Sequence, residues 1–252
     1  MVSVLIAARM GSSRFPGKTL EDLCGKPMIE QMLDRINESK LIQQVILATT
    51  INPEDDALEE WANKMGILCY RGSSNDVLGR LKGAVDKFNL DTIVELLGDN
   101  PLVHSDIIDA SIEKYKKGNF DYLATITDEY KLAKKSLKRF PIGVRVQVFS
   151  AKTIVKCENL AKSELYREHA TSFIADNPQI FNTGFLEAAG KFSQCNRPKL
   201  TFAVNHRDNL DMIRVIYENC YENNTNFSLD SAIEVLDLNP DLFSLMGDQG
   251  TN

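Results

Sequence analysis

The stretch that decides the fold is "VSVLIAARMGSSRFPGK", residues 2–18, in which a short apolar run passes directly into a polar loop. The run "VSVLIA" is almost wholly apolar, as expected of a strand that is buried on both faces of a parallel sheet. The loop after it contains glycines and cations: Gly11, Gly17, Arg9, Arg14 and Lys18. Because glycines let backbone N–H groups approach a ligand and the cations supply positive charge, we expect this loop to bind phosphate.

Strands and helices alternate through the first half of the chain. Apolar runs predict strands at residues 2–7, 44–50, 67–72 and 92–97, and three- and four-residue apolar spacing predicts helices near 27–38, 54–65 and 76–88. Continuous apolar strands joined by helices indicate a parallel sheet with helices on both faces. The polar loop would then leave the carboxyl edge of the sheet, where open α/β sheets bind their ligands.

The second half has a less regular pattern. It predicts strands at 121–126, 144–150 and 199–205, and helices at 151–161, 163–176, 208–222 and 228–237. No internal repeat, low-complexity tract or linker separates the two halves. We therefore expect an α/β fold in a single domain, residues 1–252, with a mostly parallel central sheet.

The overall composition argues against several functional classes. The net charge of −6 does not suit non-specific nucleic-acid binding, which needs a basic surface. The five cysteines form no Cys-x-x-Cys pair, which favours reduced thiols over a disulfide framework or a zinc site. No apolar run approaches the length of a membrane helix, about 18 residues, and the first residues do not resemble a signal peptide. We expect a cytoplasmic protein without a membrane segment.

The polar loop matches neither of two common phosphate-binding motifs. It lacks the Gly-Lys-Ser/Thr ending of a Walker loop and the Gly-x-Gly-x-x-Gly pattern of dinucleotide-binding folds. The alternative interpretation is a solvated loop whose cations meet nearby acids. Phosphate binding is preferred because a second polar motif is expected at the same edge of the sheet.

That motif is "LLGDNPLV" (96–103), and a third, "LTFAVNHRDNLDMIR" (200–214), follows a later strand. Asp99 comes directly after a buried strand, where a carboxylate commonly binds Mg²⁺; the alternative is a turn or helix-cap role. Asn205 could bind the same metal through its carbonyl oxygen. Asp208 could also do so, although a helix-cap role is preferred for it.

These motifs resemble those of the cytidylyltransferases of nucleotide-activated sugar biosynthesis. The similarity lies in "ARMGSSRFPGKTL…GKPMIEQ" and "GDNPLV", and it continues through "NPEDD", "YRGSSNDVLGR" and "YREHATSFI". The spore-coat polysaccharide branch is most similar, and the synthetases of CMP-ketodeoxyoctulosonate and CMP-acylneuraminate are more distant. The resemblance implies the nucleotide-diphospho-sugar transferase fold, which is GT-A-like and Rossmann-like. It also implies a Mg²⁺-dependent reaction, in which CTP and an acceptor give a CMP-linked product and pyrophosphate, and it suggests a homodimer.

The resemblance further implies roles for individual residues. Arg14, Lys18 and Asp99 would be catalytic, the first two on the triphosphate and Asp99 on Mg²⁺. The nucleotide would further contact Ala7, Ala8, Arg9, Gly11, Ser12, Lys26, Ser73, Asp76 and Arg80. The acceptor would contact Arg145, Gln147 and His169, and the metal would also contact Asn205 and Asp208. Residues 1–120 would form the nucleotide-binding half and residues 121–252 the acceptor-binding half.

Two departures from the family pattern bear on the substrates. The family has a second acid where this chain has Asn205, which should weaken Mg²⁺ binding unless Asp208 compensates. It also has acids in place of Arg145 and Gln147, which share one face of their strand. This exchange favours a small anionic acceptor of the sugar, sugar-acid, polyol or phosphonate type, in surface polysaccharide or glycoconjugate biosynthesis. The alternative is a reorganised surface ion pair.

Other interpretations remain open. The chain could be a guanylyl- or uridylyltransferase of the same fold, or a nucleotide-binding paralogue without turnover. His169 could be a packing residue instead of an acceptor contact. The basic run is interpreted as a solvated loop, with a lid over the acceptor or a subunit contact as the alternatives; its cations are Lys131, Lys134, Lys135, Lys138 and Arg139.

Overall fold

A mixed sheet forms the centre of the molecule, and the computed structural model describes residues 1–221 and 226–247. The sheet has seven strands in the order β5-β4-β1-β6-β8-β7-β9. The strands are β1 (Val2–Ala7), β4 (Gln44–Thr50), β5 (Leu68–Gly72), β6 (Thr92–Leu97), β7 (Tyr122–Thr125), β8 (Gln147–Ser150) and β9 (Thr183–Leu186). Only β8 runs against its neighbours, so the expectation of a mostly parallel sheet is confirmed.

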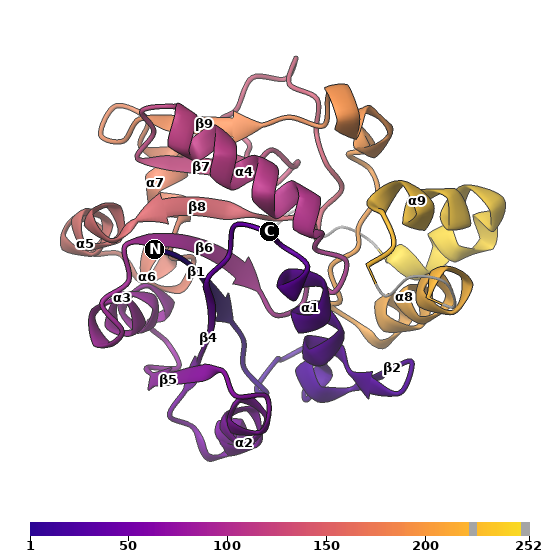
Figure 1. Cartoon of the computed structure of the whole chain (residues 1–252), viewed down its shortest axis with the longest axis horizontal. Helices are drawn as coiled ribbons and strands as arrows, with labels where there is room; N and C mark the ends of the chain where they lie inside the picture. The colour runs from indigo at the N-terminus through magenta and orange to yellow at the C-terminus, as the bar shows by residue number, and fades with distance from the viewer. Residues whose placement is uncertain (222–225, 248–252) are drawn as a thin grey trace.

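Helices cover both faces of the sheet (Figure 1). One face packs against α1 (Met28–Asn37), α2 (Asp56–Lys64) and α4 (Ser105–Lys117). The other packs against α3 (Val77–Lys87), α5 (Ala151–Leu160), α6 (Glu164–Glu168) and α7 (Ser172–Asp176). Alternation along β1 explains the two layers, because Val4 and Ile6 belong to the first apolar cluster and Leu5 to the second.

The remaining elements surround the carboxyl edge of the parallel strands. Helices α8 (Arg207–Cys220) and α9 (Leu229–Leu238) lie beside each other at this end (Figure 1). A small hairpin joins β2 (Asp22–Leu23) to β3 (Lys26–Pro27). Short 3₁₀ turns are η1 (Lys18–Leu20), η2 (Pro53–Asp55), η3 (Gly190–Cys195) and η4 (Pro240–Met246). None of the helices in residues 1–221 and 226–247 is long and apolar enough to span a membrane.

Two of the expected strands are shorter than the sequence indicates. The segment 199–205 makes one bridge, from Thr201 to Ile142, and then turns to the Asp99 carbonyl, which accepts from the Val204 N–H at 2.9 Å. The expected strand 144–150 is regular only over β8. At its start the Thr125 hydroxyl binds the Val144 carbonyl at 2.7 Å and the Val146 N–H at 3.0 Å, which interrupts the backbone ladder.

The expected helix 163–176 is divided into α6 and α7. His169 ends α6 in a non-helical conformation, and the Thr171 hydroxyl donates to Gln147 in the core at 2.6 Å. Helix α4 and strand β9 were not expected from the sequence. The helix expected at 208–222 is α8, and residue 222 lies outside the described residues.

Candidate active site

The polar loop after β1 turns back on itself before η1. Gly17 has a φ of 79°, which a residue with a side chain rarely adopts, and its N–H donates to the Met10 carbonyl at 2.9 Å. This turn directs Lys18 toward the carboxyl end of β6. A backbone hydrogen bond within the loop therefore fixes its conformation, and this conformation determines where its cationic side chains lie.

Lys18 is the cation most firmly held in this loop. Only 8% of the residue is exposed, and its Nζ lies 3.0 Å from Asp99 Oδ2 and 2.6 Å from the Val204 carbonyl oxygen. The ammonium thus joins the loop after β1, the turn after β6 and the 199–205 segment. The positive charge of the Lys18 ammonium is therefore placed to attract a phosphate oxygen at this point.

Arg14 reaches the same region from the other end of the loop. Its Nη2 donates to Asn205 Oδ1 at 2.7 Å. Arg9 instead contacts the Ser74 carbonyl, with 3.4 Å between Nη1 and the oxygen. Within residues 1–221 and 226–247, the loop cations are therefore spread along one wall and form no ion pair with an acid, apart from the contact between Lys18 and Asp99.

Asp55 anchors the loop to the neighbouring strand, and sequence reasoning did not identify it. Its carboxylate is 1% exposed and accepts from the Met10 N–H at 2.6 Å and from the Thr50 N–H at 3.1 Å. It also binds the Thr50 hydroxyl. The motif "NPEDD" contained the signal, because an Asp at the start of a helix often binds backbone N–H groups.

Asp99 stands where β6 ends and the chain turns sharply. A Cβ on Gly98 would come within 2.6 Å of the Ala8 Cβ, so only glycine lets the turn approach the loop after β1 this closely. The Gly98 N–H donates to the Ala7 carbonyl at 2.9 Å. The two polar motifs expected at one sheet edge do meet there.

Arg80 supplies a further cation from α3. It is 3% exposed, its Nη1 donates to the Ser73 carbonyl at 2.6 Å, and its Nε is buried without a partner in the described structure. Burial, helped by the charge of Arg9, lowers the pKa of Arg80 to about 10. A buried, incompletely bonded guanidinium is suited to an anionic or carbonyl-bearing ligand.

These side chains line a cavity of about 580 Å³ at the carboxyl edge of the sheet. Of the residues expected to bind substrates or metal, those in its wall are Ala7, Ala8, Arg9, Ser12, Arg14, Lys18, Arg80, Asp99, His169 and Asn205. Glu168 also lines it and was not expected to do so. The volume lies within the range of small-molecule sites, and the wall is rich in cations.

Comparison with known proteins identifies the family. A sequence model of the cytidylyltransferases matches residues 3–225. The chain belongs to the cytidylyltransferase family. It is therefore a nucleotidyltransferase, and the resemblance inferred from its motifs is confirmed.

Individual relatives agree with this family assignment. A solved cytidylyltransferase from Leptospira borgpetersenii superposes with a TM-score of 0.85 at 26% identity, over 100% of this chain and 98% of that one. The spore coat polysaccharide biosynthesis protein SpsF of Bacillus subtilis is 27% identical over 94% of both chains. A 3-deoxy-manno-octulosonate cytidylyltransferase of Hydrogenovibrio crunogenus is 37% identical over 47% of this chain and 48% of its own. The nucleotide-diphospho-sugar transferase fold expected for the family is confirmed.

Few side-chain oxygens in the cavity wall of this cytidylyltransferase are placed to bind a metal. Asp99 and Asn205 lie in the cavity wall, but each already meets a cation of the chain, Lys18 and Arg14 respectively. No group of three or more His, Cys, Asp or Glu residues suited to a metal occurs in the described residues. This donor set fits Mg²⁺ that is carried by phosphate oxygens, and does not form a complete protein cage.

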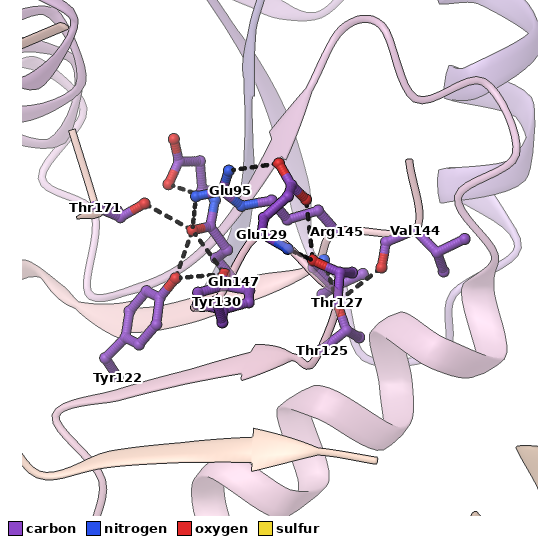
Figure 2. A network of polar contacts seen from close by, with 11 residues as sticks. Glu95, Tyr122, Thr125, Thr127, Glu129, Tyr130, Val144, Arg145, Gln147 and Thr171 are labelled. Atoms are coloured by element: carbon purple, nitrogen blue, oxygen red, sulfur yellow. Dashed lines mark hydrogen bonds and ion pairs between the residues drawn. The ribbon is translucent and has the colours of Figure 1, made fainter. Parts of the chain in front are cut away.

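Gln147 does not face an acceptor, contrary to its expected role. It is fully buried, and its Oε1 accepts from Tyr122, Thr171 and Arg145 while its Nε2 donates to Glu95 at 3.0 Å (Figure 2). Its side chain is therefore bonded within the core and does not line the active-site cavity.

Arg145 belongs to the same polar network and lies outside the cavity wall. Its Nη1 lies 3.4 Å from Glu129 Oε1, and its guanidinium stacks over the Tyr130 ring with 5.5 Å to the centroid. Its charge is thus compensated by a neighbouring acid, as the alternative interpretation of an ion pair supposed.

Several other expected contacts also lie outside the cavity wall. Gly11 and Ser73 are not part of the wall, and Asp76 caps α3 and forms an ion pair with Arg167. Lys26 is in the β2–β3 hairpin and pairs with Asp34 at 2.6 Å.

Asp208 neither lines the cavity nor caps α8. The helix begins at Arg207, so Asp208 is inside its first turn, where an acid interacts well with the helix dipole. The N-cap is His206, and Asn209 completes a capping box from the third helical position, where its Oδ1 accepts the N–H groups of Asn205 and His206 at 2.9 Å each. Asp208 is thus not placed to compensate for the acid missing at 205.

Proposed function

We propose that this enzyme transfers CMP from CTP to a small anionic sugar-type acceptor with release of pyrophosphate. The observation that supports this most directly is the convergence of Arg14, Lys18, Arg80 and Asp99 on one cavity. An acceptor hydroxyl oxygen would form a bond to the α-phosphorus of CTP. The bond from that phosphorus to the bridging oxygen would break, pyrophosphate would leave, and the hydroxyl proton would be released.

The chain would contribute mainly charge and position to this step. Lys18 and Arg14 would hold the triphosphate and neutralise the charge that develops on pyrophosphate. Arg80 and the backbone at Ala7 and Ala8 would hold the cytidine part of CTP. Mg²⁺, held by Asp99 and Asn205 together with the phosphates, would supply further positive charge to the leaving group.

The acceptor would enter on the side of Glu168 and His169, opposite the loop after β1. Both side chains are exposed and line the cavity, and neither has an ion-pair partner in the described part of the chain. His169 is thus free to donate a hydrogen bond to an acceptor carboxylate. The name of the Hydrogenovibrio relative supports a sugar acid, since 3-deoxy-manno-octulosonate carries a carboxylate.

Thermal unfolding with separate nucleotides tests the base. A ligand at a hundredfold excess over its Kd adds about 2.7 kcal/mol to the stability of the native state. We expect CTP with Mg²⁺ to raise the Tm by about 5–10 °C and UTP, GTP and ATP to raise it far less. Release of pyrophosphate in the presence of 3-deoxy-manno-octulosonate then tests turnover. An equal response to UTP or GTP would favour a uridylyl- or guanylyltransferase, and CTP binding without turnover on any sugar acid would favour the non-catalytic paralogue.

A further inference from the structure

A second cavity, of about 630 Å³, lies beneath the loop that joins β7 to β8. We name it the lysine pocket, and its lining residues are Asp128, Tyr130, Lys131, Ala133, Lys135, Ser136, Leu137, Lys138, Arg139, Asn196 and Pro198. None of these residues lines the active-site cavity. The reaction proposed at Asp99 therefore gives this pocket no role.

The charges around this pocket are almost all positive and mostly uncompensated. Lys131, Lys135 and Lys138 are exposed, and none of the three forms an ion pair in the described residues. The lining has one carboxylate, Asp128, and this is paired with Arg139, with 3.4 Å between Oδ1 and Nε. In a chain of net charge −6, the segment 131–139 has five cations and no acid. Such a local excess attracts anions.

The polar groups of the wall are free to donate hydrogen bonds. Asn196 Oδ1 accepts from the Arg139 N–H at 3.0 Å, which leaves its amide Nδ2 without a partner in the described part of the chain. The Ser136 hydroxyl also has no partner there. The wall thus offers ammonium, amide and hydroxyl donors, and its carboxylate is already used. This set of groups suits an acceptor-rich ligand such as a phosphate or a carboxylate.

The loop above the pocket is held in shape by its own contacts. The Arg139 guanidinium donates to the Thr127 carbonyl at 2.5 Å and to the carbonyls of Ala133 and Lys134 at 3.3 Å each. The Phe140 N–H donates to the Ile126 carbonyl at 2.8 Å, which closes the ends of the loop. Arg139 is thus a framework residue, and the three exposed lysines are left for a ligand. A framework of this kind lowers the entropy that binding would cost.

The lysine pocket lies on the same edge of the sheet as the active site. Strand β7 runs parallel to β9 and antiparallel to β8, which is antiparallel to β6, so β6 and β7 end at one edge. Tyr130 lines the pocket and also joins the polar network of Arg145 and Gln147 (Figure 2). The same network holds Thr171, two residues after His169. Hydrogen bonds through Tyr130, Gln147 and Thr171 therefore connect the wall of the lysine pocket to the segment that carries His169, although the two cavities have no lining residue in common.

We propose that the lysine pocket binds a small anion through a phosphate or carboxylate group, at a site separate from the triphosphate. Lys131, Lys135 and Lys138 supply the charge, and Ser136 and Asn196 donate hydrogen bonds. The anion is either a distant group of the acceptor or a free anion in solution. Both sources present the same chemistry to the pocket, and competition between them distinguishes the two.

Calorimetric titration with inorganic phosphate at constant ionic strength, without CTP, tests this site. To remove the contribution of the active-site cations, all variants are made in the Lys18→Ala chain, in which the pocket is intact. Adding Lys131→Glu/Lys135→Glu should weaken phosphate binding about tenfold or more relative to Lys18→Ala alone. The matched control adds Lys116→Glu/Lys152→Glu, which makes the same charge change at exposed lysines of α4 and α5. Phosphate should bind to this control as it binds to Lys18→Ala.

Two results would contradict the proposal that the lysine pocket binds an anion. No phosphate binding to Lys18→Ala, or the same loss in both double variants, would show that the lysines act only as bulk surface charge. A second titration, with 3-deoxy-manno-octulosonate present, separates the two sources of the anion. Displacement of phosphate would assign the pocket to the acceptor, and unchanged phosphate binding would assign it to a free anion. Because CTP is absent, these outcomes do not depend on the proposed nucleotide.

Discussion

The two oxygens best placed for a metal are each held by a cation of the same chain. Lys18 Nζ lies 3.0 Å from Asp99 Oδ2, and Arg14 Nη2 lies 2.7 Å from Asn205 Oδ1. The cations proposed to bind phosphate therefore occupy the oxygens proposed to bind the metal: Lys18 forms an ion pair with Asp99, and Arg14 donates to the neutral amide oxygen of Asn205. A triphosphate would offer these cations a stronger partner and would leave the oxygens free.

The substitution Lys18→Met tests this arrangement at a single residue. We expect turnover to fall by about 100-fold or more, because the variant lacks the buried charge that would hold the triphosphate. Without nucleotide, the variant should bind Mn²⁺ about tenfold more tightly than the unsubstituted chain, because Asp99 Oδ2 no longer has an ammonium partner. Turnover is measured as pyrophosphate release and Mn²⁺ binding by electron paramagnetic resonance.

The matched control is Lys26→Met. Lys26 pairs with Asp34 outside the cavity wall, so this variant should keep both turnover and Mn²⁺ affinity. Normal pyrophosphate release from Lys18→Met would contradict the role assigned to Lys18. Unchanged Mn²⁺ affinity would contradict the competition for Asp99.

At the scale of elements, residue identity predicted which side chains gather in the cavity better than it predicted which backbone segments pair. Arg14, Lys18 and Asp99 could be recognised because each follows a strand end that periodicity locates. The 199–205 segment has strong strand periodicity, yet the Val204 N–H binds the Asp99 carbonyl instead of a neighbouring strand. Which backbone segments pair depends on contacts between residues that are far apart in the sequence. A local sequence pattern carries no information about those contacts.

Helix α4 and strand β9 were missed for different reasons. Helix α4 has a clear signal, since Ile107, Ile108 and Ile112 have helical spacing and are buried, and His104 caps the first turn. Strand β9 has almost none, because it is four residues long, lies at the sheet edge and contains Gly184. The first omission could have been avoided from the sequence, and the second could not.

The turn η2 anchors the loop after β1, for which phosphate binding is proposed. Replacing Asp55 with alanine leaves the N–H groups of Met10 and Thr50 and the Thr50 hydroxyl without their acceptor. We expect Asp55→Ala to lower the free energy of unfolding by about 2–4 kcal/mol, since hydrogen bonds to a buried charge are costly to lose. It should also raise the KM for CTP by about tenfold, because the loop is no longer anchored.

Denaturant unfolding and steady-state kinetics measure the two effects. The adjacent variant Asp56→Ala is the control, since Asp56 is largely exposed and its partner Arg71 keeps a second carboxylate, Glu59. Asp56→Ala should change both quantities little. A loss of stability in Asp55→Ala with an unchanged KM for CTP would show that η2 supports the fold and not the loop.

At the scale of the whole molecule, one buried polar network joins the two halves of the chain. Glu95 lies on β6 and binds Gln147 on β8, which in turn binds Tyr122 on β7 and Thr171 beyond α6 (Figure 2). The first half carries the loop after β1, and the second carries His169 and the lysine pocket. The network therefore links the elements that carry these sites. The sequence had assigned Gln147 to the acceptor and Thr171 to a helix, and it gave no sign that either belongs to a buried network with Glu95 and Tyr122.

This network makes stability depend on pH in a predictable direction. Glu95 is 3% exposed, and its burial raises its pKa above the usual value of 4.5. Between pH 4.5 and the raised pKa, the folded protein keeps a proton that the unfolded chain has released. The free energy of unfolding should therefore fall as pH rises through this window, by at most about 1.4 kcal/mol per pH unit.

The variant Glu95→Gln isolates this contribution, because its amide oxygen can still accept from Gln147 Nε2 but cannot titrate. Urea unfolding between pH 4.5 and 8 should show the unsubstituted chain losing stability relative to this variant as pH rises. The control Glu113→Gln, at an exposed position on α4, should give a difference from the unsubstituted chain that does not follow this trend. A constant difference between Glu95→Gln and the unsubstituted chain would mean that Glu95 stays ionised in the core. The charge of Arg145, which is the strongest influence that lowers the pKa of Glu95, would then outweigh the effect of burial.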